Sequence, residues 1–156
     1  MERKVGATMA ILAAILALVS VFGHIATTEE LLLQQKASDQ WAYYQSKSIR
    51  RYQSEFAKDV LAAVKGSEAA AKKYEANFDR YQKDSEQIQE RARDLERESE
   101  SKGRQALRLH IGEIFLEISI VFSSLAILTR RLHFWWMAIL GGAIGSAVAA
   151  TVFIIR

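Results

Sequence analysis

Three ionisable side chains share one face of an apolar stretch in the C-terminal third of this chain. His110, Glu113 and Glu117 are spaced three and four residues apart, and Ser124 follows seven residues later. On a helix this spacing places all four side chains on the same face. An ionised carboxylate in hydrocarbon costs about 3 kcal/mol, so each glutamate must face protein or water, pair with a cation, or take up a proton.

Two interpretations give this face a chemical role. In the first, several copies of the chain arrange Glu113, Glu117 and Ser124 as a ring that lines a cation or proton pathway, as rings of charge do in channels. In the second, His110 joins Glu113 and Glu117 as ligands of a divalent metal ion.

A third interpretation needs no activity. The apolar core of the membrane then begins only near Ile114, and the two glutamates pair with Arg108 or Arg104 at the interface. His24 ends the first apolar stretch at the same membrane face, where we expect its ring to be solvated.

Three apolar stretches of 22 residues each are long enough to cross a membrane. About 20 apolar residues span the hydrocarbon core, and the stretches are Val5 to Ala26, Leu107 to Leu128 and Phe134 to Ile155. The first is too long for a cleaved signal peptide, and His24-Ile25-Ala26 lacks the small-residue cleavage pattern. We therefore predict three transmembrane helices in contact with membrane lipid.

The polar segment between the first two spans, Thr27 to Ala106, carries no net charge. It holds 15 Lys and Arg against 15 Asp and Glu, with no basic face, so nucleic acid is not expected as a partner. The chain has no cysteine, which excludes disulfides and thiol chemistry. No glycine-rich phosphate loop and no nucleophile beside a base is found. We predict no enzyme activity, no catalytic residue and no cofactor.

Gly66 and Ser67 divide this polar segment into two equal arms. Glycine suits the end of a helix and serine the start of the next, and the chain contains no proline. We predict a long antiparallel helical hairpin that turns at these two residues. Paired positions then have residue numbers that sum to about 133, which places Tyr52 against Tyr81 and Phe56 near Phe78.

The second arm repeats in steps of three and four, as a coiled coil does, and the repeat continues into the second span. Its members are Tyr74, Phe78, Tyr81, Ser85, Ile88, Ala92, Leu95, Ser99, Lys102, Ala106, Leu109, Glu113, Leu116 and Ile120. The aromatic residues Trp41, Tyr43, Tyr44, Tyr52 and Phe56 of the first arm are expected in the hairpin core rather than in a binding patch. The seam still contains many serines and glutamines, so further packing against copies of the chain is expected.

Small residues form ridges on two of the spans. In lipid, small side chains let helices approach closely. The third span carries the ridges Gly141, Gly145, Ala149 and Gly142, Ser146, Ala150. The first span has a side made of Gly6, Ala10, Ala13, Ala14, Ala17 and Ser20.

The short basic segments predict how the chain is oriented. Arg3, Lys4, Arg130 and Arg131 flank spans in short segments, where positive residues favour the cytoplasmic side. We therefore expect a cytoplasmic N-terminus and a periplasmic hairpin.

Two runs resemble a known family. The run Ala37-Ser38-Asp39-Gln40-Trp41-Ala42-Tyr43-Tyr44-Gln45-Ser46-Lys47-Ser48-Ile49 resembles the signature of a bacterial membrane family recorded as a domain of unknown function. The second span, Gly112 to Ile118, and the turn Leu128-Thr129-Arg130-Arg131 are similar to it as well. The resemblance implies a three-span protein of the bacterial inner membrane and implies no activity.

The sequence thus predicts an all-α membrane protein with three spans and a long hairpin between the first and second. The function expected from it is a homo-oligomeric scaffold, or a surface that docks another protein through the hairpin. The alternative is an oligomeric cation or proton channel, or a proton-coupled subunit, that uses Glu113 and Glu117.

Overall fold

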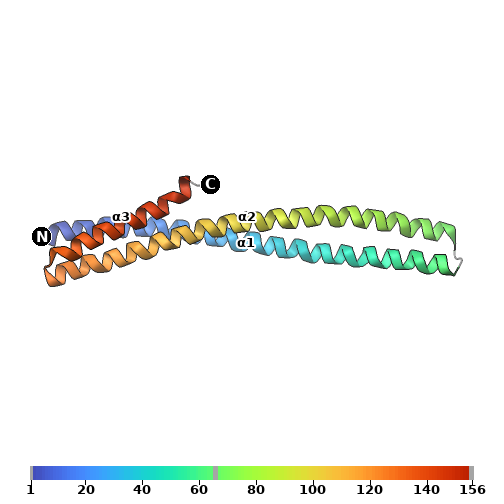
Figure 1. The fold of residues 1–156 in the computed structure, drawn as a ribbon, viewed down its shortest axis with the longest axis horizontal. Coiled ribbons are helices and arrows are strands. Elements are labelled where there is room, and N and C mark those ends of the chain that lie inside the picture. The colour runs from blue at the N-terminus through green and yellow to red at the C-terminus, as the bar shows by residue number, and fades with distance from the viewer. Residues whose placement is uncertain (1, 65–66, 155–156) are drawn as a thin grey trace. The chain divides into compact units, whose positions relative to one another are not determined.

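The chain folds entirely into α-helices. A computed structural model describes residues 2–64 and 67–154 as three helices: α1 (Glu2–Ala63), α2 (Glu68–Thr129) and α3 (Leu132–Ile154). Helices α1 and α2 pack together as an antiparallel hairpin, as predicted (Figure 1). Each of these two helices contains both a predicted span and a predicted arm, because no proline or glycine pair interrupts the chain between them.

Each of the three helices is long and apolar enough to cross a membrane. Helix α3 begins at Leu132, two residues before its predicted start, so the turn from α2 contains only Arg130 and Arg131. Arg130 has a φ of 55°, the left-handed conformation that commonly ends a helix. This confirms the tight turn that the sequence predicts between the second and third spans.

At the other end of the hairpin, α1 ends at Ala63 and α2 begins at Glu68. The carbonyl of Ser67 accepts the first hydrogen bond of α2 from the Ala71 amide at 3.1 Å, as an N-cap residue does. Gly66, the other predicted turn residue, lies outside the described residues, as does Ile155.

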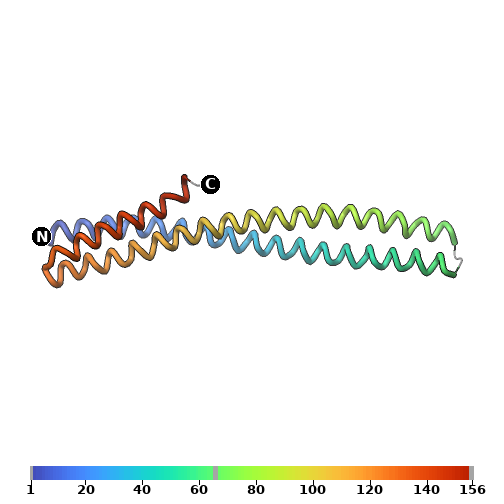
Figure 2. The backbone as a smooth tube through the Cα atoms, viewed as in Figure 1, coloured from blue at the N-terminus to red at the C-terminus, as the bar shows by residue number. Residues whose placement is uncertain are grey.

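The chain divides into two compact units, which we describe separately. The bundle unit contains Met1–Glu30 and Glu100–Arg156, and the hairpin unit contains Leu31–Ser99. In the bundle unit, α3 folds back beside the ends of α1 and α2 (Figure 2). Its core is an apolar cluster of Leu12, Val19, Ala26, Ala106, Leu109, Leu116 and Ala149.

Glycines set the distance between α2 and α3. A β-carbon on Gly145 would lie 2.7 Å from the carbonyl oxygen of Gly112, so the two backbones touch. Gly141 approaches Ser119 of α2, whereas Gly142 packs on Leu12 of α1. The predicted glycine ridges of the third span therefore pack within the chain. Ser146 is half-buried, and its hydroxyl donates to the Gly142 carbonyl of its own helix at 2.7 Å.

The three-and-four repeat predicted for the second helix is the face that α2 buries. Its members Ser85, Ile88, Ala92, Ser99, Ala106, Leu109 and Leu116 are buried. Contacts between α1 and α2 follow the antiparallel arrangement that was predicted. Within the bundle unit, Lys102 pairs with Glu29 at 2.6 Å, and within the hairpin unit Lys47 pairs with Asp84 at 2.7 Å. Both pairs have residue numbers that sum to 131, two less than the predicted sum of 133.

The prediction that the aromatic residues of the first arm form the hairpin core is wrong for Tyr43, Tyr52 and Phe56, which are exposed, whereas Trp41 and Tyr44 are half-buried. Phe56 is 71% exposed and Tyr52 58% exposed, while Ser54 between them is only 6% exposed. Helix α1 is therefore rotated relative to the expected face. Among the described residues of the first arm, the buried ones are Ala37 and Ser54, and both side chains are small.

The contact between Gly112 and Gly145 predicts how α3 responds to added volume. Gly112→Ala would place a methyl group 2.8 Å from the Gly145 carbonyl oxygen, so α3 must move away from α2. We expect a loss of about 1–3 kcal/mol, as for other overpacked sites. Thermal unfolding of the detergent-solubilised protein, followed by circular dichroism, measures it. Gly6→Ala is the matched control, because nothing lies within 4 Å of its added carbon, and equal losses for both variants would contradict the contact.

Candidate functional site

A polar cluster lies between α1 and α2 in the bundle unit, and His110 is at its centre. Its Nε2 lies 3.1 Å from the hydroxyl of Thr27, and its Nδ1 lies 3.1 Å from Glu113 Oε2. The Glu113 side chain is only 19% exposed and also accepts a hydrogen bond from Ser20 of α1. The His24 ring packs edge-on to His110 with centroids 6.4 Å apart and remains exposed.

The hydrogen bonds of this cluster fix where its protons can lie. The Thr27 hydroxyl donates to the Gly23 carbonyl at 3.0 Å, so toward His110 it can only accept, and Nε2 carries a hydrogen. The facing pair of Nδ1 and the Glu113 carboxyl then holds one proton between two atoms. Either the imidazolium faces a carboxylate or a neutral imidazole faces a carboxylic acid.

Neither arginine proposed from the sequence as a partner of the glutamates pairs with Glu113. Arg104 instead forms an ion pair with Glu100 at 3.8 Å, one turn away on the same helix. Glu113 points into the bundle, where His110 and Ser20 are its hydrogen-bond partners. The sequence could not indicate this, because Ser20 comes from the other helix and its proximity depends on the pairing of α1 with α2.

Glu117 differs from Glu113 in its surroundings. It is exposed on the outside of the bundle unit and has no ion-pair partner among residues 2–64 and 67–154. Ser124 is also exposed, and its hydroxyl bonds to the Ile120 carbonyl at 3.1 Å and contacts Met9 sulfur at 3.9 Å. The structure therefore brings His110 and Glu113 together and leaves Glu117 apart from them.

The metal interpretation of this face gains no support. Within the described part of the chain, no group of three or more histidine, aspartate or glutamate side chains is placed to hold a metal ion. His110 and Glu113 use the atoms that would bind a metal to bond each other.

A second polar site, which sequence reasoning missed, lies in the hairpin unit. Lys47 Nζ donates to Asp84 Oδ2 at 2.7 Å and lies 5.4 and 5.5 Å from the ring centroids of Tyr43 and Tyr81. The hydrogen bond to Asp84 raises the pKa of Lys47 above its ordinary value, against the opposing effect of burial. Nearby, the Trp41 indole donates to Glu96 at 2.8 Å.

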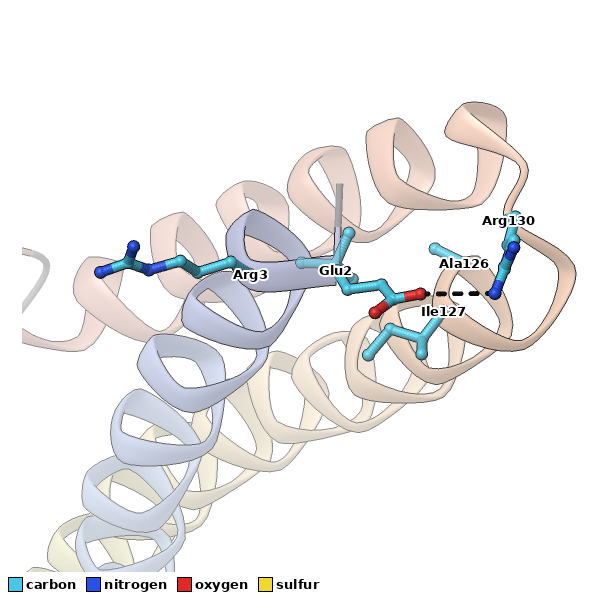
Figure 3. Close-up of a pocket in the computed structure, with 6 residues that line it drawn as sticks. Glu2, Arg3, Ala126, Ile127 and Arg130 are labelled. Atoms are coloured by element: carbon cyan, nitrogen blue, oxygen red, sulfur yellow. Dashed lines mark ion pairs between the residues drawn. The ribbon is translucent and has the colours of Figure 1, made fainter.

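A shallow pocket of about 480 Å³ opens at the end of the bundle unit that contains the turn between α2 and α3. Glu2, Arg3 and Arg130 line it with apolar side chains of both helices (Figure 3). Arg130 pairs with Glu2 across it at 3.8 Å, and both side chains are largely exposed. The contact is a surface ion pair, which contributes little to stability.

The raised pKa of Lys47 predicts a stability change at alkaline pH. A raised pKa in the folded state contributes stability that is complete below the unfolded value, about 10.4, and is lost as pH rises through the higher folded value. We expect the wild type to lose stability there, and Lys47→Arg to lose less because its guanidinium stays charged. Unfolding midpoints measured from about pH 9 to about pH 12 test this. Equal losses in the two proteins would show that Lys47 does not cause the change.

Comparison with known proteins identifies the family and adds no activity. No curated protein and no solved structure matches the chain. One family does match, over residues 1–155, and its description is a domain of unknown function, DUF4337. The family match agrees with the resemblance described from the sequence, and the matched residues include the three spans and the hairpin. The chain therefore belongs to the DUF4337 family.

Proposed function

We propose that this protein is a structural component of the bacterial inner membrane. Its three spans anchor a helical hairpin, and several copies assemble into a scaffold that can also dock a further protein through the hairpin. The observation that carries the proposal is the exposed carboxylate of Glu117.

Glu117 lies deep in the apolar part of α2. It is ten residues beyond Leu107, the predicted start of the span, which is about 15 Å along a helix and half of a hydrocarbon core of about 30 Å. In a single copy this exposed side chain would face lipid, where the ionised form costs about 3 kcal/mol. A neighbouring subunit can supply a polar partner or a water-filled contact at that depth.

A second surface supports assembly through the membrane. Ala10, Ala14 and Ala17 of α1 are exposed in the bundle unit, although the small residues of α3 are used within the chain. Exposed alanines at this spacing let the helix of another subunit approach closely. Their position on α1 leaves the α2–α3 contact undisturbed.

The short basic segments support the proposed orientation. Arg3 and Lys4 lie at the start of α1, and Arg130 and Arg131 form the turn between α2 and α3, at the same end of the bundle unit. Positive residues in short segments favour the cytoplasmic side, which leaves the hairpin in the periplasm.

Assembly is tested by counting subunits. We expect the wild type, reconstituted in lipid nanodiscs, to contain several copies per particle by mass photometry. Glu117→Leu should reduce that number, because the new side chain suits lipid and no longer pairs with a neighbour. Glu100→Leu is the control, since Glu100 is exposed outside the predicted spans. A wild-type protein that is strictly monomeric in nanodiscs would contradict the scaffold.

Proton coupling is a second candidate, favoured by the proton shared between His110 and Glu113. If the cluster conducts protons, Glu113→Gln should abolish proton flux into liposomes. The amide side chain stays neutral and cannot take up or release the proton that the carboxyl group shares with His110. Glu117→Gln reports separately on the exposed carboxylate. Proton flux that is absent in the wild type, or unchanged when Glu113→Gln and Glu117→Gln are combined in one variant, leaves the scaffold as the remaining proposal.

A further inference from the structure

The arm of α1 in the hairpin unit has two opposite faces. The face toward α2 carries the charged side chains, and the exposed face is uncharged, which is the reverse of the usual amphipathic helix. The inner face, toward α2, contains no exposed residue. Its members are Ala37, Gln40, Tyr44, Lys47, Arg51, Ser54, Lys58 and Leu61. Three of these are cations, and buried atoms of Arg51 and of neighbouring Ser48 find no hydrogen-bond partner within the described chain.

The opposite face of the same arm is exposed and uncharged. We call it the outer stripe, and its members are Leu31, Gln35, Ser38, Ala42, Gln45, Ile49, Tyr52 and Phe56. They follow one another in strict alternation of four and three residues, the spacing of a coiled-coil seam. The next position in the series is Asp59, so the stripe ends at Phe56.

A hairpin that stands alone in water loses stabilisation because the large apolar side chains of the outer stripe stay exposed. Burying a large apolar side chain contributes about 1.5–3 kcal/mol, yet Ile49, Tyr52 and Phe56 are 57%, 58% and 71% exposed. Helix α2 cannot cover them, because it packs on the other side of α1 against small and cationic residues. Another helix must cover the outer stripe for this burial to be realised.

We propose that the outer stripe pairs with the outer stripe of a second copy of this chain, as a parallel two-stranded coiled coil. The proposal rests on the homo-oligomer proposed above and names its contact surface outside the membrane. Two copies in one membrane, anchored by the same spans, send their α1 arms in the same direction. Each residue of the stripe then lies opposite itself.

Self-pairing of this kind is sensitive to charge, and the stripe is compatible with it. A charged residue in the seam would face its own copy and repel it, but all eight members are uncharged. The charged residues directly beside the stripe are Asp39 and Glu55. In a parallel register Asp39 faces Gln34 of the second copy and Glu55 faces Val60, so no like charges meet. The seam is about 38 Å long, and its glutamines favour one register.

Single cysteines test the stripe, since the chain has none of its own. The variants are Tyr52→Cys and Phe56→Cys in the stripe, with Arg50→Cys as a matched control. Arg50 is exposed at the same height on α1 but outside the stripe. Each full-length variant is reconstituted in proteoliposomes, checked for helix content and treated with a mild oxidant. A disulfide requires α-carbons within about 7 Å, which equivalent seam residues of a parallel pair satisfy.

We expect most chains of Tyr52→Cys and Phe56→Cys to run as covalent dimers, and most chains of Arg50→Cys to remain monomers. Equal yields for all three variants would indicate random collision and overturn the proposal. Absent stripe dimers, with several copies per nanodisc particle, would overturn the stripe but leave the scaffold intact. A single copy per particle would overturn both.

A second measurement keeps the proposal testable if a cysteine variant misfolds. Tyr52→Asp combined with Phe56→Asp places like charges in the seam and should abolish crosslinking at an Ile49→Cys site. Arg50→Asp, outside the stripe, should leave that crosslink unchanged. A stripe that crosslinks to a different protein in native membranes, and never to its own copy, assigns the surface to a foreign helix and overturns the self-pairing.

Discussion

Close approach of helix backbones is the constraint on which this structure depends. In the bundle unit, Gly112 and Gly145 bring α2 and α3 into direct backbone contact. In the hairpin unit, Ala92 and Ser85 of α2 are small side chains that are buried at 0% and 2% exposure. Small contacts bury little apolar area, so they hold helices together through many short-range dispersion contacts.

Polar and apolar side chains are distributed between the inside and the outside of the chain in an unusual way. Glu113 and Lys47 are held inside the chain by hydrogen bonds that include a partner from the opposite helix, Ser20 and Asp84 respectively, while Glu117 and Phe56 are outside. Inside, Glu113 and Lys47 each have a hydrogen-bonded partner, which lowers the cost of burying their charge, whereas the buried Nε of Arg51 has none within the described chain. On the outside, Glu117 is an exposed carboxylate within an apolar span, and Phe56 is an exposed ring on the polar arm. Neither side chain suits its surroundings. Both mismatches are removed by contact with another protein surface, and this is the physical case for assembly.

Much of this fold could be predicted from the sequence. The apolar stretches, the absence of proline, the turn at Arg130 and the repeat on α2 are local signals, and the structure agrees with them. The rotation of α1 could not be predicted in the same way, because its arm carries two stripes at helical spacing. Tyr52 and Phe56 were expected to face α2, but the structure turns the more polar stripe toward it, where Lys47 pairs with Asp84. The contact of Glu113 with Ser20 was missed for a related reason, since it depends on which residues of two distant segments meet.

The turn at Arg130 has a consequence for how the chain enters its membrane. A left-handed backbone costs a residue other than glycine about 1–2 kcal/mol, and glycine would adopt it freely. Arginine at this position has that conformational cost, but it supplies one of the two positive charges between α2 and α3. Such charges bias a growing chain toward one topology during insertion. Arg130 in the turn thus makes the finished fold slightly less stable than glycine would. It also adds a positive charge that guides the topology of the last two spans during insertion.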